Sequence, residues 1–515
     1  MRSLNSPSRA SSNFWYRLPL LVLASVLAGF AAATESPVLI ASIAGLVGLL
    51  FFIAIPPYSI ILAIFGLSFV VVGLIGYFGR LEQIYWLPYL LGLMLYLHVA
   101  AAALSLKPAG HRQPPSFFWA VVAFLVAVLA SALINLIDPL QLVIATKNYL
   151  FLWSVFFILA FGITDERLFQ RLWQGLLVVA AIQLPVALLQ YVRAGAHGWD
   201  AVSGTFGGSE TGGASGFLGL SMIVALTLML ALLREKLLSW KMATALALLC
   251  LAPVAMAEVK AAVILFLPIA LFLLYYKDLK RNPLVFLWLA GFGAAIVIGT
   301  FTIYQFLHYS QVDTGQRQRP AIERITEAID LETDSTYVRK LTGEMSRIGI
   351  LVFWWREHSL SQADKILFGH GPGSLRSSSF YLGEIARKYP FYRMDRHAIA
   401  FLLWDLGLVG LGTFALVLLG GIRLSFSLSD KTTIPILHRT YLRVGAVTLA
   451  LLSSSLIYNR SVIDSAAGQA LFMLCLGQAA FWHARGGASP VRCIRDGTRD
   501  SYRMSSLLLA GPAEK

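Results

Sequence analysis

Residues 398–421 read AIAFLLWDLGLVGLGTFALVLLGG, a run of 24 residues in which Asp405 is the only charged side chain. A helix needs about 20 mostly apolar residues to cross the hydrocarbon core of a bilayer. The run therefore predicts a membrane-spanning helix. It directly follows a long polar segment that ends at Arg396 and His397, so it also marks the point where the chain re-enters the membrane.

Apolar runs of this length recur along the whole chain. The composition is 57% hydrophobic and 13% charged, with a mean hydropathy of +0.71, which is unlike that of a soluble domain. The sequence predicts an all-α, polytopic integral membrane protein with about 14 transmembrane helices. The predicted spans are 15–34, 37–55, 58–78, 84–105, 117–137, 142–163, 168–192, 213–233, 239–257, 259–276, 284–306, 398–421, 440–459 and 464–483.

The first span has an alternative interpretation. The apolar stretch from Leu18 to Phe30, preceded by basic residues and followed by Ala31-Ala32-Ala33, also fits a cleaved signal peptide. A retained span is favoured because many spans follow. The breaks at Pro56-Pro57 and at Glu258–Lys260 are short, which leaves open how the spans beside them are separated.

Basic residues predict the orientation of the chain. Lys and Arg concentrate in loops that face the cytoplasm. With the N-terminus inside, the short outer connections contain only Arg80, Arg193 and Arg460. This places both termini in the cytoplasm and residues 308–397 outside. It also accounts for the net charge of +14 without a nucleic-acid partner.

The predicted spans divide the chain into four parts. These are a membrane region of about 11 spans (1–307), a large outer loop (308–397), a membrane region of about 3 spans (398–483) and a mobile cytoplasmic tail (484–515). Apolar spacing predicts short helices in the loop over 319–331 and 335–359. The loop contains no cysteine, which excludes a disulfide framework there.

Two outer connections contribute cations before the large loop. Residues 193–210 are glycine-rich and contain Arg193, so they form either part of a site or a flexible turn. Glu258-Val-Lys260 interrupts an apolar run, and ionisable groups in such positions line a cavity or reach toward the interface. Lys260 is therefore placed either to meet an anionic headgroup or to pair with Glu258.

The large loop adds further candidate residues. Arg347 and Trp354 are seven residues apart and share a helix face, and Arg356 follows them. Gly369-His-Gly-Pro-Gly373 follows no predicted strand, which argues against a nucleotide site. It predicts a sharp turn whose open backbone N–H groups suit an anion or close packing.

Arg396 and His397 stand where the loop re-enters the membrane. A histidine there is either a general base near neutral pH or an interfacial residue. Several cations and a histidine on one membrane face suit a lipid-linked diphosphate, whose charge is neutralised during transfer. The chain has no Asp-x-Asp pair and no cluster with metal-ligand spacing, so a metal-free site without a cofactor is the simpler interpretation.

These segments resemble the bacterial superfamily of O-antigen ligases and polysaccharide polymerases over residues 193–420. Trp355 precedes Gly369 by 14 residues, as in the family's Trp-to-Gly-x-Gly spacing. Lys260 replaces the family's central Arg, which keeps the charge but loses the bidentate fork. The other matching segments are Ser203-Gly-Thr-Phe206, Ala257-Glu-Val-Lys260-Ala-Ala262 and the re-entry run from His397 to Gly410.

The register of the re-entry motif has two solutions. An ungapped match places Arg396 on the family's His, whereas a shift of one residue places His397 there. Chemistry favours His397 because Arg cannot act as a base.

The resemblance implies a glycosyltransferase of the bacterial inner membrane that acts on the periplasmic face. Its donor would be an undecaprenyl-diphosphate-linked glycan and its second substrate a glycan acceptor, with a chain-length regulator as a further partner. His397 would orient or deprotonate the acceptor hydroxyl. The residues expected to bind the diphosphate are Lys260, Arg347, Arg356, Arg193 and Arg396.

Three functions stay open at this stage. A polymerase of O-antigen or exopolysaccharide is favoured over a ligase that transfers glycan to lipid A core, mainly because Lys260 and the re-entry motif look unlike the ligases. A transporter or flippase would favour paired charges near the bilayer midplane. Lys147-Asn148 is the only deep polar pair, and it lies nearer the outer end.

Overall fold

The computed structural model describes residues 55–105, 114–194, 201–208, 213–304, 306–307, 334–336, 338, 343–358, 362–377 and 381–486. Throughout these residues the fold is helical, and β pairing within them is limited to isolated bridges such as Glu344 with Arg393. The predicted span 15–34, nearly all of 37–55, the loop helix 319–331 and the tail from 487 lie outside the described residues.

Nine helices in the described part of the chain are long and apolar enough to cross a membrane. The all-α class and the membrane character of the chain are therefore confirmed. Their elements are α3 (Pro57–Gly66), η1 (Leu67–Val71) and α4 (Val72–Gly79); η2 (Glu82–Trp86) and α5 (Leu87–Ser105); α7 (Pro139–Thr146), η3 (Lys147–Phe151) and α8 (Trp153–Ala160); α9 (Glu166–Ala194); α10 (Ser215–Arg234); η5 (Ala262–Phe266) and α12 (Leu267–Arg281); α13 (Leu284–Tyr304); α18 (Ala398–Ser429); and α19 (Ile436–Tyr458).

Three more helices occupy predicted spans. α6 (Phe118–Ile134) and α11 (Trp240–Met256) are apolar but have 17 residues each, and α21 (Ala466–Ala484) has 19. Each predicted span from 58–78 onward therefore coincides with a helix in the structure. The total of 14 crossings stays a prediction.

Burial separates the helices into a centre and a rim. α10 and α19 are buried along most of their length, whereas α13 is almost entirely exposed, with Trp288 at 81%. An apolar surface of this kind is what bilayer hydrocarbon covers, so the exposure of α13 is consistent with a membrane setting. Inside the bundle, small residues let helices approach closely. A Cβ on Gly477, for example, would clash with Leu159.

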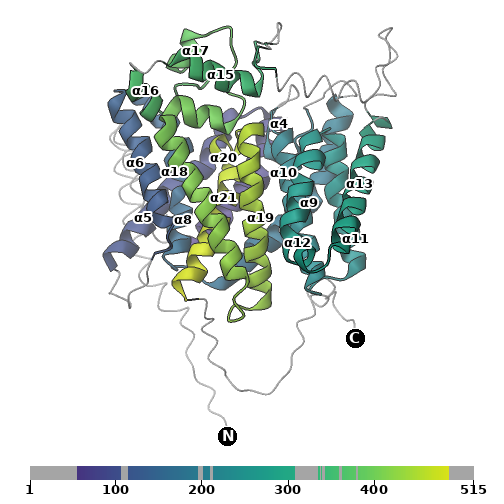
Figure 1. Ribbon diagram of the computed structural model, residues 1–515. Helices are drawn as coiled ribbons and strands as arrows, with labels where there is room; N and C mark the ends of the chain where they lie inside the picture. The colour runs from purple at the N-terminus through teal and green to yellow at the C-terminus, as the bar shows by residue number, and fades with distance from the viewer. Residues whose placement is uncertain are drawn as a thin grey trace, which may run out of the picture.

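Three short helices gather at one end of the bundle, which we call the capped end. They are α15 (Arg347–Glu357), α16 (Ala363–Phe368) and α17 (Glu384–Lys388), and they lie above α18 in Figure 1. The helix predicted over 335–359 is shorter in the structure. α15 begins only at Arg347 because Ser346 caps it, with its hydroxyl oxygen accepting the Gly349 N–H at 2.9 Å.

A break in α18 joins the capped end to the bundle. Gly407 has a φ of 66° and a ψ of −163°, and a Cβ at this position would clash with the backbone of Leu367. The break frees the carbonyls of Trp404 and Asp405 from the helix. They accept hydrogen bonds from the backbone N–H groups of His370 at 2.7 Å and Gly371 at 3.1 Å. The turn after α16 is thereby fixed into the kink of α18.

Candidate functional site

Asp405 is fully buried beside this kink and is held by four neutral donors. One carboxylate oxygen accepts from the Tyr149 hydroxyl at 2.9 Å and the Gly373 N–H at 2.8 Å. The other accepts from the Ser374 hydroxyl at 2.9 Å and the Leu375 N–H at 3.1 Å. Among the described residues no cation forms an ion pair with this carboxylate, so the four hydrogen bonds alone compensate its burial.

The glycine-rich turn supplies one of these donors, the Gly373 N–H, and the two residues that follow it supply two more. Gly369, Gly371 and Gly373 have φ values of 68°, 92° and 84°, a conformation that favours glycine. The sequence predicted open N–H groups suited to an anion or to close packing. In the structure these N–H groups do bind an anion, the carboxylate of Asp405. Because Asp405 belongs to α18, the same hydrogen bonds also pack the turn against that helix.

A second carboxylate, the half-buried Asp464, is surrounded by cations instead. It lies at the end of α20 (Ser461–Asp464), where Arg376 contacts it at 3.1 Å and Arg460 at 3.2 Å. The Asn148 amide donates to it at 2.9 Å. Burial alone would raise the pKa of Asp464, but Arg376 and Arg460 hold it well below its usual range.

Lys147 lies beside Asp464 on a π-helical segment. Its ammonium sits over the rings of Trp86 and Tyr89, at 4.6 and 5.0 Å from their centroids. Three consecutive residues of η3 are buried: Lys147, Asn148 and Tyr149. The wider π turn thus directs Asn148 to Asp464 and the next side chain to Asp405, and such turns occur often at functional sites.

Arg460 extends the charged cluster toward the start of α18. Besides Asp464 it contacts the Asp395 carboxylate at 2.5 Å. Arg396 follows in the chain and donates to the main-chain oxygen of Met345 at 3.1 Å.

Arg347 closes this row from α15. Its Nε donates to the main-chain oxygen of Tyr458 at 3.1 Å, and its guanidinium lies 4.6 Å from the centroid of the Tyr458 ring. We call the whole row the cation band. It consists of Lys147, Arg347, Arg376, Arg396 and Arg460, with the carboxylates Asp395 and Asp464.

His397 is the N-cap of α18, and both of its ring nitrogens are engaged. Nδ1 accepts the Ala400 N–H at 3.2 Å, and Nε2 lies 3.2 Å from the main-chain oxygen of Arg347, to which its N–H donates. Burial, with Arg347 and Arg396 adding to it, lowers the pKa of His397 to about 4, so the ring is neutral near pH 7. Its catalytic role stays a prediction, and that role requires Nδ1 to release the Ala400 amide.

The structure brings Arg347 of α15 beside the re-entry residues Arg396 and His397, through the main-chain oxygens of Met345 and Arg347. Lys260 instead pairs with Glu258 at 3.4 Å, which was the alternative interpretation of this segment. Its hairpin is still near the band. Gly216 on α10 packs against Tyr458, and Gly219, about one turn further, packs against Val259.

Two predicted residues lie apart from the band. Arg193 is exposed at the end of α9, with its guanidinium 5.4 Å from the ring centroid of Phe78. Arg356 is exposed in the last turn of α15. The contacts that the structure describes join neither of them to the cation band.

Sequence reasoning missed a histidine pair in the capped end. The Nε2 atoms of His358 and His370 are 3.0 Å apart, and both rings contact Trp404. Burial, then His358 beside it, lowers the pKa of His370 to about 4. The sequence singled out the Gly-His-Gly turn that contains His370. It could not show the pairing, because His358 lies on the other side of α16 in the chain.

The chain was also compared with known proteins. It matches no protein-family model and no curated protein. What the site can do therefore follows from its geometry. In the described part of the chain Arg376 and Arg460 contact Asp464, and Lys147 lies beside them. Such a cluster of cations is suited to bind a multivalent anion.

Proposed function

We propose that this chain is a membrane glycosyltransferase that binds a lipid-linked diphosphate at the capped end and transfers the glycan attached to it. The observation that carries the proposal is the centre of the cation band, where Lys147, Arg376 and Arg460 gather around Asp395 and Asp464 among the described residues. Charges that are partly removed from water need a counter-charge. A diphosphate supplies it, and its lipid part occupies the bilayer that the apolar helices imply.

The proposed reaction is a substitution at the sugar carbon attached to the diphosphate. An acceptor hydroxyl oxygen bonds to that carbon, and the bond from the carbon to the diphosphate oxygen breaks. The electron pair leaves with the lipid diphosphate, and the hydroxyl proton passes to His397 once its Nδ1 is free. Arg376, Arg460 and Lys147 would stabilise the negative charge that grows on the leaving group.

Within this class, polymerisation of undecaprenyl-diphosphate-linked repeat units into O-antigen or exopolysaccharide is the favoured reaction. The support is the sequence resemblance, with Lys260 in place of the central Arg. Ligation of the glycan to lipid A core is the alternative, since it shares the donor and the chemistry. In both cases the capped end faces the periplasm, which agrees with the predicted excess of basic residues on the other side.

The proposal is tested in cells that depend on this chain for polymer. Arg376→Gln should reduce long glycan at least about 10-fold, since it removes a charge-assisted contact to the leaving group. Arg387→Gln is the matched control, because Arg387 is exposed on α17 at the same end. Normal chain lengths from a well-expressed Arg376→Gln protein would contradict the proposal. Single repeat units accumulating on lipid indicate a polymerase, and long unattached lipid-linked chains indicate a ligase.

Transport is the candidate from another class. The observation in its favour is the position of the buried Lys147 and Asn148 beside the half-buried Asp464, which resembles the paired charges of ion-coupled carriers. Flipping of lipid-linked sugar by purified protein in vesicles, without any new glycosidic bond, would favour this function over transfer.

A further inference from the structure

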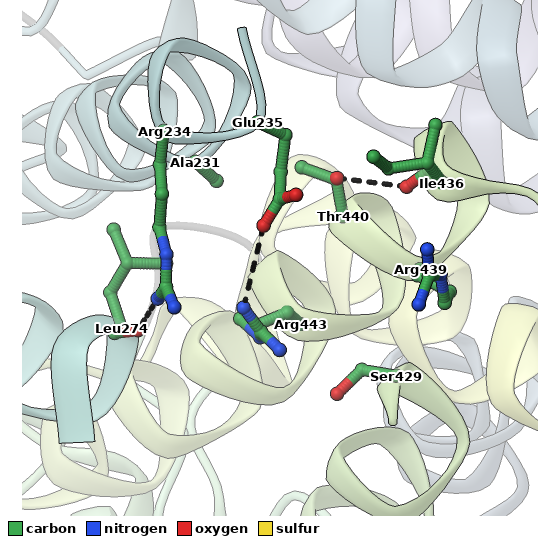
Figure 2. Close-up of a pocket in the computed structure, with 9 residues that line it drawn as sticks. All are labelled: Ala231, Arg234, Glu235, Leu274, Ser429, Ile436, Arg439, Thr440 and Arg443. Atoms are coloured by element: carbon green, nitrogen blue, oxygen red, sulfur yellow. Dashed lines mark hydrogen bonds and ion pairs between the residues drawn. The ribbon is translucent and has the colours of Figure 1, made fainter. Parts of the chain in front are cut away.

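A small cavity lies at the end of the bundle opposite the capped end. Its volume is about 40 Å³, several times the roughly 10–15 Å³ needed for one water. It lies where α10 and α12 end and where α18 passes into α19, so helix ends surround it (Figure 2). None of the residues of the cation band lines it.

Three arginines line this cavity, against a single carboxylate, Glu235. Arg234 is fully engaged, since it contacts Asp278 at 3.0 Å and donates to the main-chain oxygen of Leu274 at 2.9 Å. Arg443 is only loosely paired. Its nearest carboxylates, those of Glu235 and Asp430, are both 3.7 Å away, beyond hydrogen-bond distance.

Arg439 is the residue that the cavity leaves unsatisfied. Its Nε is buried and has no hydrogen-bond partner among the described residues. Figure 2 draws ion pairs or hydrogen bonds to Arg234 and Arg443 but none to Arg439. Arg439 and Arg443 are four residues apart on α19 and share a helix face, so their guanidinium groups flank the same space.

A buried guanidinium donor without an acceptor is costly, and an anion in the cavity would remove that cost. The guanidinium of an arginine can donate two parallel hydrogen bonds to phosphate oxygens, which the ammonium of a lysine cannot do. The helix ends also bring the cavity to the level at which lipid headgroups lie.

We propose that this cavity binds a phosphate group, held by Arg439 and Arg443. The group comes either from the headgroup of an anionic phospholipid or from free phosphate. Neither the donor glycan nor the transfer reaction enters this inference, so it stands independently of the proposed function.

The test uses the full chain in a neutral detergent, with thermal unfolding as the measurement. Dioctanoyl phosphatidylglycerol and inorganic phosphate are titrated separately, with dioctanoyl phosphatidylcholine as a lipid that carries no net charge. The wild type should show a saturable rise in the unfolding midpoint with phosphatidylglycerol or phosphate. Arg439→Gln should weaken that response about 10-fold or more.

Two further variants separate specific binding from other causes. Arg423→Gln is the matched control, because Arg423 is exposed on α18 toward the same end and does not line the cavity. It should keep the wild-type response. Arg439→Lys keeps the charge but not the fork, and should bind more weakly than wild type while folding normally.

Each outcome decides the proposal or its source. A response to phosphatidylglycerol alone supports a lipid headgroup, and a response to inorganic phosphate supports free phosphate. No response to either probe, an unchanged response in Arg439→Gln, or an equal loss in Arg423→Gln would overturn the proposal.

Discussion

Asp405 is a buried and Asp464 a half-buried carboxylate at the same end of the molecule, and their surroundings are opposite in kind. Asp405 is satisfied by two backbone N–H groups and two hydroxyls. Asp464 is contacted by two arginines and an amide, with Lys147 close by. Both depend on η3, since Asn148 reaches one carboxylate and Tyr149 the other.

The difference indicates two functions. The donors around Asp405 are neutral and satisfy its oxygens, so no cation there is left for a ligand, and Asp405 fastens the glycine-rich turn to the kink of α18. Around Asp464 the cations outnumber the carboxylates, and the surplus charge is available to an anionic ligand. Asp405 is therefore expected to determine stability, and the surroundings of Asp464 to determine binding.

The largest expected effect comes from Asp405→Asn. The amide replaces one accepting oxygen by a donor, so two of the four hydrogen bonds are lost in a buried site. A hydrogen bond to a charged group contributes about 1.5–3 kcal/mol, which gives a loss of about 3–6 kcal/mol. Thermal unfolding of the purified protein measures it. A variant as stable as the wild type would remove the structural role assigned to Asp405.

Asp464→Asn should destabilise less, by about 2–3 kcal/mol, because the Arg460 side chain that it leaves behind is already 41% exposed. The stability that Asp464 contributes should also depend on pH, which separates its role from that of Asp405. The folded-state pKa of Asp464 is lowered, so its stabilising effect is present above its ordinary pKa of 3.8 and is lost as the pH falls below that value. The wild type should lose more stability than Asp464→Asn when the pH drops from 5 to about 3. Parallel curves for the two proteins would contradict this account.

Ser374→Ala tests the Asp405 side of the comparison with a smaller change. It removes one hydroxyl donor and leaves the other three in place. We expect a loss of about 1.5 kcal/mol in thermal unfolding, with unchanged glycan length. A large loss of transfer activity without a loss of stability would place Asp405 in the functional site instead.

His397 allows a finer test, since Asn can cap a helix but cannot act as a base. His397→Ala should cost about 1 kcal/mol, and His397→Asn much less. The pKa of His397 is lowered to about 4, so the wild type loses this contribution as the pH falls from about 6.5 to 4, and both variants should lose less. Activity that survives in His397→Asn but not in His397→Ala would assign His397 a positioning role; loss in both would support the base.

The sequence was sufficient for the helices and for part of the site. Hydropathy identified each described span because a helix in lipid must be apolar over its whole length. Arg396 and His397 could be placed at the membrane interface because they directly precede an apolar run, whereas the contact of His397 with Arg347 joins elements 50 residues apart. The shortened start of α15 was not foreseen, since the cap at Ser346 outweighs the apolar spacing before it.

The partners of the buried charges could not be predicted. Asp464 and Asn148 are 316 residues apart in the chain, and Arg376 belongs to a third element. The sequence offered one signal, because a lysine inside a span needs a counter-charge. It did not show where that charge would come from. The sequence likewise could not decide whether Lys260 meets an anionic headgroup or pairs with Glu258, and the structure shows the pairing.

Binding of undecaprenyl diphosphate to the purified protein in nanodiscs of neutral lipid tests the central claim most directly. The wild type should bind it saturably, Arg376→Gln should weaken the affinity about 10-fold or more, and Arg387→Gln should not change it. Equal affinity of the wild type and Arg376→Gln, with both proteins folded, would contradict a role of the cation band in holding the diphosphate.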